Sequence, residues 1–175
     1  MPLSRRAFLR VLAISSVGTA GASNSTRAIG APQFDCKAAL ETYALNGLYD
    51  VISKNGTPYN EGTQFYIETK KVEGGYRLTA LAPKGTGRPE HPPNFVMIKD
   101  AVVTCNEKGY LEVEGMFEGG ALKSTGKLYP APVKGRIIPH ASGIEVSLVI
   151  NFSGTPIQPH GGYEGRLRLF RKYIG

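Results

Sequence analysis

Short segments in which apolar and polar residues alternate, separated by tight turns, run through most of this chain. From residue 48 onward, turn pairs such as Asn55-Gly56 and Gly74-Gly75 interrupt the alternation at short intervals. A period of two indicates a strand with one face against a core, and such turns join antiparallel neighbours. Strands are predicted at 48–53, 63–71, 76–82, 95–105, 110–117, 123–129, 134–139, 144–152 and 163–174. Eight or nine strands joined by hairpins predict an all-β fold: a single antiparallel up-and-down barrel of about eight strands or, as the alternative, a β-sandwich.

A short helix is expected before the first strand. Asp35 is a residue type that caps helix N-termini, residues 36–44 include good helix formers, and Gly47 lies just past their end. Two connections, 83–94 and 153–162, are long and rich in glycine and proline. Loops of this length often carry function.

The N-terminal residues have the order of an export signal. The segment Ser4-Arg5-Arg6-Ala7-Phe8-Leu9-Arg10 resembles the twin-arginine motif, with Arg10 in place of the usual lysine. An apolar run of about 12 residues follows and ends in Ala20-Gly21-Ala22, which resembles a cleavage site; a membrane span needs about 20. The resemblance implies export of the folded chain through the twin-arginine translocase, with Arg5 and Arg6 as the recognised pair. A basic N-terminal tail that is never cleaved is the alternative.

The chain is therefore divided into a signal peptide (1–22), a small, polar, flexible leader (23–34) and one barrel domain (35–175). No other apolar run approaches the length of a membrane span, so we expect a periplasmic or secreted protein without a stable membrane anchor. Loss of Arg5, Arg6 and Arg10 with the signal lowers the net charge from +7 to +4. The remaining cations are scattered, which argues against a nucleic-acid partner.

Cys36 and Cys105 are the only cysteines of the chain. In an oxidising compartment two cysteines most simply form one disulfide, and a closed loop of roughly 70 residues would stabilise the fold by about 4 kcal/mol in the chain-entropy model. Two free buried thiols or a metal site are the alternatives. The pair has no C-x-x-C spacing, so neither a redox motif nor a zinc knuckle is indicated.

The start of the strand region resembles the plan of the lipocalins and the wider calycin group. In that family a short helix precedes a Gly-x-Trp motif that begins the barrel, and an arginine from the last strand packs over the aromatic ring. Gly47 and Tyr49 match the glycine and the aromatic residue, and Arg166 or Arg168 would be the arginine; the chain has no tryptophan. The resemblance implies an eight-stranded barrel wide enough for one small apolar ligand.

Four side chains are candidates for ligand binding. Tyr49 and Tyr66 would give a pocket an apolar wall with a hydrogen-bonding tip. Arg166 and Arg168 share one face of the last predicted strand and would meet an anionic group by charge-assisted bonds. The alternative for the arginines is a charged edge strand that discourages pairing with other chains.

The three histidines, His91, His140 and His160, all follow or precede prolines in predicted connections. Converging loop histidines would bind zinc, copper or nickel, and such a metal site is a further hypothesis. Three solvent-exposed loop residues are the alternative, because the spacing has no metal-ligand pattern. No other cofactor is predicted.

Three functions remain open at this point. The first is a non-catalytic exported barrel that binds a small apolar or amphipathic ligand. The second is an accessory subunit or inhibitor that binds another exported protein through 83–94 and 153–162. The third is a small barrel enzyme of the cyclase or isomerase type. An apolar cavity would favour the ligand-binding barrel. A filled barrel with an exposed apolar patch on its loops would favour the accessory subunit. A cavity that holds a histidine or glutamate with a perturbed pKa would favour the enzyme.

Overall fold

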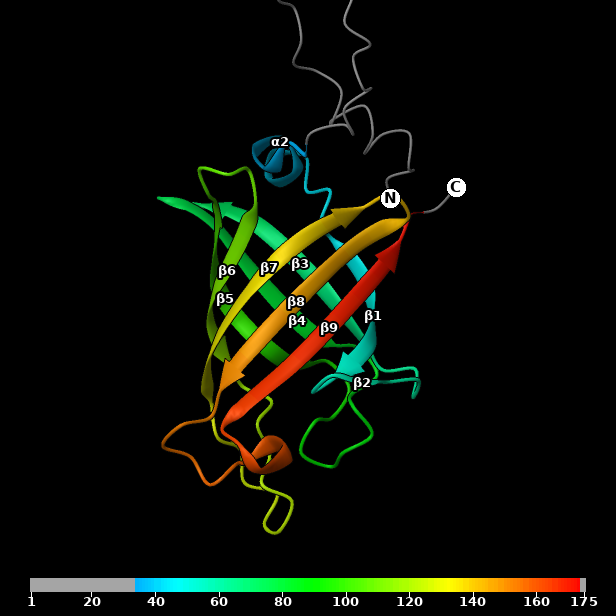
Figure 1. The fold of residues 1–175 in the computed structure, drawn as a ribbon, viewed down its shortest axis with the longest axis vertical. Helices are drawn as coiled ribbons and strands as arrows, with labels where there is room; N and C mark the ends of the chain where they lie inside the picture. Colours follow the sequence, from blue (N-terminus) through cyan, green and yellow to red (C-terminus); the bar gives the residue numbers. More distant parts are fainter. Residues whose placement is uncertain (1–33, 174–175) are drawn as a thin grey trace, which may run out of the picture.

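Eight antiparallel strands close on themselves in the computed structural model, which describes residues 34–173 (Figure 1). Each wall strand pairs with the next along the chain, and β1 also pairs with β9 to complete the circle. A two-residue strand, β2 (Thr57–Pro58), folds back on β1. The all-β barrel is thus confirmed over the sandwich. The wall strands are β1 (Gly47–Lys54), β3 (Gln64–Val72), β4 (Gly75–Ala82), β5 (Phe95–Cys105), β6 (Leu111–Phe117), β7 (Ala131–His140), β8 (Gly143–Asn151) and β9 (Glu164–Lys172).

The alternation of the sequence fixes which side chains fill the barrel. In β3 the buried positions are Phe65, Ile67 and Thr69, and the residues between them are exposed. The same period of two runs along β6 and, from residue 146 onward, along β8, whose first four residues are all buried. Because successive side chains of a strand point to opposite faces, every second residue enters the core. The core is therefore one continuous cluster inside the barrel.

The two ends of the barrel differ in their connections. At one end, called here the helix end, tight hairpins join β3 to β4, β5 to β6 and β7 to β8, and helix α2 (Cys36–Glu41) lies over the rim (Figure 1). At the other, called the loop end, the connections are the longer segments 55–63, 83–94, 118–130 and 152–163. The long connections therefore make the loop end the place where a binding site is expected.

Helix α2 is capped by its own N-terminal residue and is fixed to the barrel by a disulfide and a buried face. The Asp35 carboxylate accepts the Ala38 N–H at 3.0 Å, which satisfies one free donor of the first turn. Ala39 and Leu40 are buried. A disulfide joins Cys36 to Cys105 of β5, with their Cα atoms 5.8 Å apart. The predicted pairing is confirmed, whereas the helix ends earlier than residue 44.

One predicted strand is wrong. Residues 123–129 belong to the connection 118–130, in which a single bridge pairs Ala121 with Leu128. A turn separates these two residues, and Gly126 adopts a φ of +68° in it. Gly120 also packs so closely on the Tyr129 carbonyl that an added Cβ would lie 2.5 Å from its oxygen. The β-forming residues of this segment thus fold back locally instead of joining the wall.

Within residues 34–173, no helix is long and apolar enough to cross a membrane. The predicted signal peptide, the leader up to residue 33 and the Arg5-Arg6 pair lie outside the described residues.

Candidate functional site: a cavity at the loop end

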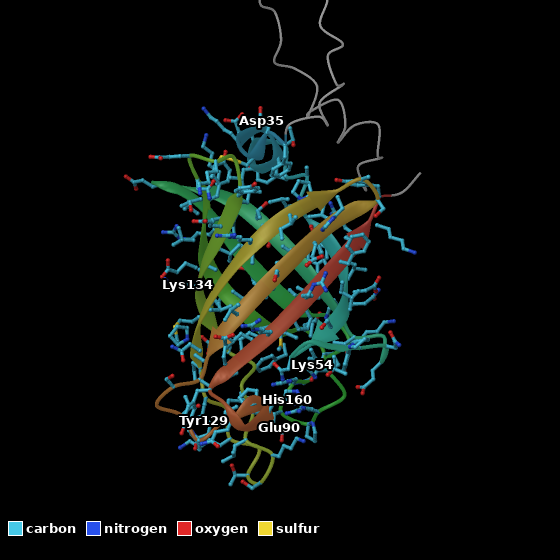
Figure 2. The ribbon with its side chains drawn as sticks, viewed as in Figure 1. Asp35, Lys54, Glu90, Tyr129, Lys134 and His160 are labelled. Carbon is cyan, nitrogen blue, oxygen red and sulfur yellow. A yellow bond between two sulfur atoms is a disulfide. The ribbon has the colours of Figure 1, made fainter. Side chains whose placement is uncertain are left out.

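A cavity of about 890 Å³ occupies the loop end of the barrel, between the ends of the strands and the four long connections. Figure 2 shows Lys54, Glu90, Tyr129 and His160 at this end, far from Asp35 at the helix end. The wall of the cavity is apolar because the inward positions of the strands reach it. Its buried apolar side chains are Val51, Phe65, Met97, Phe117, Ile150, Phe152 and Leu167.

Three cations from three segments also line this cavity. Lys54 ends β1, Arg88 comes from 83–94, and Lys123 comes from 118–130. Within the described residues none of the three has an ion-pair partner. The Lys54 ammonium lies over the Tyr59 ring, 4.7 Å from its centroid, and the Tyr59 hydroxyl donates to the Glu61 carboxylate at 2.7 Å. The opening therefore carries an excess of positive charge.

The electrostatics of Lys54 show that these cations act on one another. Burial is the first cause that lowers the pKa of Lys54, and the charges of Arg88 and Lys123 lower it further, while Glu61 raises it. Like charges within a few ångströms disfavour the protonated amine. An anion placed among these groups would relieve that repulsion.

His91 brings a polar group to the cavity wall. The residue is 4% exposed, and its Nδ1 lies 2.7 Å from the Thr86 hydroxyl. The ring packs on Phe95 with 4.7 Å between centroids. The Gly119 carbonyl is near enough to influence its pKa but makes no satisfactory hydrogen bond with Nε2, which is buried without a partner. Burial, followed by the charge of Arg88, lowers the pKa of His91, so the imidazole is neutral at pH 7.

The conformation of segment 83–94 holds His91 in this place. Gly85 has a φ of +71°, and an added Cβ would lie 2.3 Å from the His91 carbonyl oxygen. The Thr86 N–H donates to that same carbonyl, and the His91 N–H donates to the Arg88 backbone carbonyl. Only glycine combines this φ with so close a backbone approach. The local fold of the loop thus sets both His91 and Arg88 at the cavity.

The Gly-x-aromatic motif lies at the helix end, not in the cavity. Tyr49 is fully buried, and its hydroxyl donates to the Leu45 carbonyl at 2.7 Å. Burial raises the pKa of Tyr49, so its hydroxyl stays protonated. Arg171 of β9 lies over the Tyr49 ring, with its guanidinium carbon 5.1 Å from the centroid, and donates to the carbonyls of Ala44 and Asn46. This arrangement agrees with the lipocalin-like plan.

The arginine of that arrangement corrects the prediction. Arg166 or Arg168 was expected over the aromatic ring, but Arg171 takes this position. A Cβ on Gly47 would lie 2.5 Å from the Arg171 guanidinium, so the glycine leaves room for the arginine. Tyr49 and Arg171 therefore close the helix end.

The remaining predicted ligand residues lie apart from one another. Tyr66 is 38% exposed at an outward position of β3. Arg168 lies on the outer wall and makes two hydrogen bonds of 2.8 Å to the Glu145 carboxylate, which lower the pKa of Glu145. Arg166 lines the cavity and pairs with Glu164 at 2.6 Å. A role in ligand binding stays a prediction for Arg166, whereas Tyr49, Tyr66 and Arg168 lie outside the cavity lining.

The three histidines are not brought together. His91 and His160 line the loop-end cavity, whereas His140 ends β7 at the helix end, with Nε2 3.4 Å from Glu145. The described part of the chain contains no group of three or more histidine, cysteine, aspartate or glutamate side chains able to hold a metal ion.

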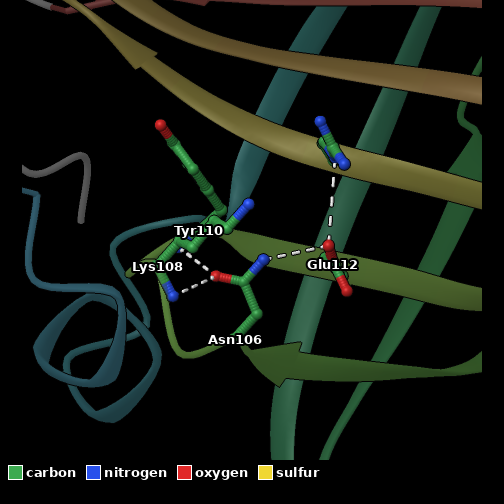
Figure 3. A network of polar contacts seen from close by, with 5 residues as sticks. Asn106, Lys108, Tyr110 and Glu112 are labelled. Atoms are coloured by element: carbon green, nitrogen blue, oxygen red, sulfur yellow. Dashed lines mark hydrogen bonds and ion pairs between the residues drawn. The ribbon is translucent and has the colours of Figure 1, made fainter.

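A polar network at the helix end has a structural explanation (Figure 3). The Asn106 side-chain oxygen accepts the N–H groups of Lys108 and Tyr110, and its amide donates to Glu112 at 2.9 Å. Arg136 lies 3.9 Å from the same carboxylate. Asparagine commonly organises turns in this way. The network therefore shapes the β5–β6 hairpin.

Comparisons of the chain with protein-family models, with curated proteins and with solved structures found no match. The sequence predicted a possible functional role for the long connection 83–94 and offered His91 as a metal candidate, but it did not single out Lys54, Arg88 and Lys123. Their long separation along the chain left no motif to find, since only the packing of the connections brings them together.

Proposed function

We propose that this protein is a non-catalytic binding protein whose barrel holds one small amphipathic molecule. The observation that carries the proposal is the loop-end cavity, with a volume of about 890 Å³, an apolar wall and polar groups at its opening. Ligand pockets are commonly about 300–1,000 Å³, mostly apolar, with a few polar groups that fix orientation. The apolar part of the ligand would lie among Val51, Phe65 and Leu167.

An enzyme of the cyclase or isomerase type is the second candidate, and His91 is the observation that favours it. A neutral, buried imidazole at the wall of a cavity can accept a proton from a bound substrate. We favour binding because apolar side chains and fixed cations make up most of the lining.

The accessory-subunit function has less support. Segments 83–94 and 153–162 were expected to meet a protein partner, but residues of both line the cavity, among them Thr86, Arg88 and Ile157. Their side chains thus contribute to a concave site and not to a protruding apolar patch.

We further propose that the protein works in the periplasm or outside the cell after twin-arginine export. The Cys36–Cys105 disulfide supports this proposal, because disulfides persist mainly in oxidising compartments. The export signal itself remains a sequence-based proposal.

A fluorescence titration tests the binding function. N-phenyl-1-naphthylamine, a neutral apolar probe, should bind at one site per molecule and brighten in the cavity. Val51→Phe adds bulk to an inward side chain of the cavity wall and should weaken the probe at least about tenfold. Val102→Phe is the matched control, because Val102 is 40% exposed on the outer wall. Equal binding by both folded variants would contradict the cavity as the site. Native mass spectrometry of protein purified from its own compartment would then show which molecule it carries.

A further inference from the structure

We propose that the opening of the cavity is an oxyanion site, and that the ligand is an amphiphile with an anionic oxygen headgroup held by Lys54, Arg88, Lys123 and His91. This inference rests on the proposed binding function and names the chemical class of its ligand. The headgroup would be a carboxylate or a phosphate ester, and the apolar chain would enter the barrel.

The first argument is the charge around the opening. Lys54, Arg88 and Lys123 reach it from three segments that are distant in sequence, and no described acid forms an ion pair with any of them. Glu61, which also lines the cavity, is engaged by the Tyr59 hydroxyl. Glu61 nevertheless offsets only part of the charge, because Arg88 and Lys123 still act against the protonated form of Lys54. Gathering cations without partners is unfavourable in the free protein, and an anion would compensate it.

Glu90 and the Arg166–Glu164 pair also contribute to the net charge around the opening. Glu90 acts on His91 and opposes the effect of Arg88, and its side chain lies against Gly126. Arg166 lines the cavity but is already paired with Glu164. With Arg166 and Glu164 neutralising each other, three cations face Glu61 and Glu90. The local excess therefore remains positive.

The second argument is the unpartnered nitrogen of His91. His91 is 4% exposed and lines the cavity, and its Nε2 is itself buried; no hydrogen bond of good geometry reaches this nitrogen, although the Gly119 backbone acts on the ring as an acceptor. When the Thr86 hydroxyl donates to Nδ1, the neutral ring carries its proton on Nε2. A buried donor without a well-aligned acceptor is costly, and a headgroup oxygen that reached this buried nitrogen would satisfy it. We assign this tautomer to the bound state.

The third argument is the apolar lining of the same cavity. Phe65, Met97 and Phe117 belong to the same cavity and are buried apolar side chains. A small inorganic anion would leave this apolar space unused, and a neutral apolar molecule would leave the cations unpaired. An anionic amphiphile satisfies both halves of the site. Charge-assisted bonds from Arg88 and the lysines would fix its headgroup at the opening.

Displacement of N-phenyl-1-naphthylamine by molecules with one chain length tests this proposal. Dodecanoate and dodecyl phosphate carry the anionic headgroups, and dodecanol is their neutral counterpart. We expect at least one of the two anions to bind about tenfold or more tighter than dodecanol, and a rise in NaCl from about 20 to about 500 mM to reduce that difference. The stronger of the two anions identifies the headgroup.

Variants that remove a charge show which residues cause the preference for anionic headgroups. Lys54→Gln, Arg88→Gln and Lys123→Gln should each weaken the preferred anion roughly three- to tenfold and leave dodecanol unchanged. His91→Phe keeps a flat ring without the donor and should do the same. Lys70→Gln is the control, because Lys70 is exposed on β3 toward the helix end and its loss changes the net charge equally.

The possible outcomes separate this inference from the function on which it rests. Equal binding of anions and dodecanol, unchanged in every variant, would overturn the oxyanion site and leave the binding function standing. The oxyanion site would also be overturned if Lys70→Gln weakened anion binding as much as Lys54→Gln, Arg88→Gln and Lys123→Gln do. Net charge alone would then explain the preference. No binding of the probe or of any chain would count against the binding function itself. Charge-dependent binding to phosphatidylglycerol vesicles, without preference among the free amphiphiles, would overturn the site in favour of a lipid surface.

Discussion

His91 lines the cavity with one ring nitrogen bonded to Thr86 and the other buried without a well-aligned hydrogen-bond partner, which is unusual for a polar side chain. The imidazole is held neutral because burial and the charge of Arg88 both oppose protonation. Neutral histidine in such a place can donate to an anion without carrying a charge of its own into the barrel. Its pH response is therefore a test of how the unliganded site is built.

The free energy of unfolding should depend on pH through His91. The pKa of His91 in the folded protein lies below the ordinary 6.5, so the unfolded chain takes up the proton first as the pH falls. The stabilisation is complete above pH 6.5 and is lost toward the folded-state pKa, at up to about 1.4 kcal/mol per pH unit. Urea unfolding at about pH 7.5 and pH 5.5 measures this loss.

A matched pair of variants assigns that slope to His91. His91→Gln should flatten the dependence between about pH 5.5 and 7.5, while His160→Gln, at an exposed position, should retain it. Glu145 does not interfere, since its pKa is lowered from 4.5 and it titrates at more acidic pH. An unchanged slope in His91→Gln would show that the imidazole is not held neutral by the fold.

At the scale of elements, β9 holds the helix end together through one side chain. Arg171 lies over the ring of Tyr49 from β1 and donates to the carbonyls of Ala44 and Asn46, which precede that strand. A planar guanidinium can stack and form two directed bonds at once, which a lysine ammonium cannot. The last strand, the first strand and the segment that follows α2 thus meet at Arg171.

We expect Arg171→Lys to destabilise the protein by about 2–3 kcal/mol, because it keeps the charge but leaves a buried carbonyl without its donor. Arg136→Lys is the control on the outer wall, where the arginine is exposed and lies 3.9 Å from Glu112; it should change stability by less than about 0.5 kcal/mol. Urea unfolding gives both values. Similar, small losses in the two variants would mean that Arg171 does not hold the helix end.

The alternation of residues predicted the wall strands well. The same alternation, used to decide which side chains point inward, would have improved two assignments: the arginine of the last strand and Tyr66. Leu167 and Leu169 point inward on β9, so Arg171 shares their parity while Arg166 and Arg168 do not. Tyr66 likewise lies between inward residues of β3. The expectation of Arg166 or Arg168 over the aromatic ring, and the separate expectation of Tyr66 in a pocket, therefore fell on outward side chains, whereas Tyr49 is inward.

The connections set the limit of prediction from sequence. Residues 123–129 were predicted as a strand, but backbone hydrogen bonds within the connection 118–130, such as Tyr129 N–H to the Gly120 carbonyl, fold them back on themselves. Lys54, Arg88 and Lys123 line one cavity only because the end of β1 and two connections pack at the same end of the barrel. Such a site follows from the arrangement of loops in space, which local patterns do not encode.

At the scale of the whole molecule, the two ends of the barrel differ: one is closed and the other contains the cavity. A disulfide, a helix and the Tyr49–Arg171 contact close the helix end. The loop end keeps the cavity and the cations. A barrel closed and fixed at one end can hold the other open, because all eight strands share one continuous set of hydrogen bonds. The disulfide, which depends on an oxidising compartment, also relates this closure to the proposed export.

Export and closure can be tested together by changing the twin-arginine pair. In Arg5→Lys combined with Arg6→Lys, we expect a longer precursor to remain in the cytoplasm, with Cys36 and Cys105 open to alkylation because disulfides rarely form there. Exported wild-type protein should be shorter and unreactive toward a polyethylene-glycol maleimide, as cell fractionation and a gel shift would show. Arg10→Lys restores the usual residue of the motif and should be exported normally. Normal export of the double variant would refute the twin-arginine signal, and a retained precursor with an intact disulfide would separate the closure of the barrel from its export.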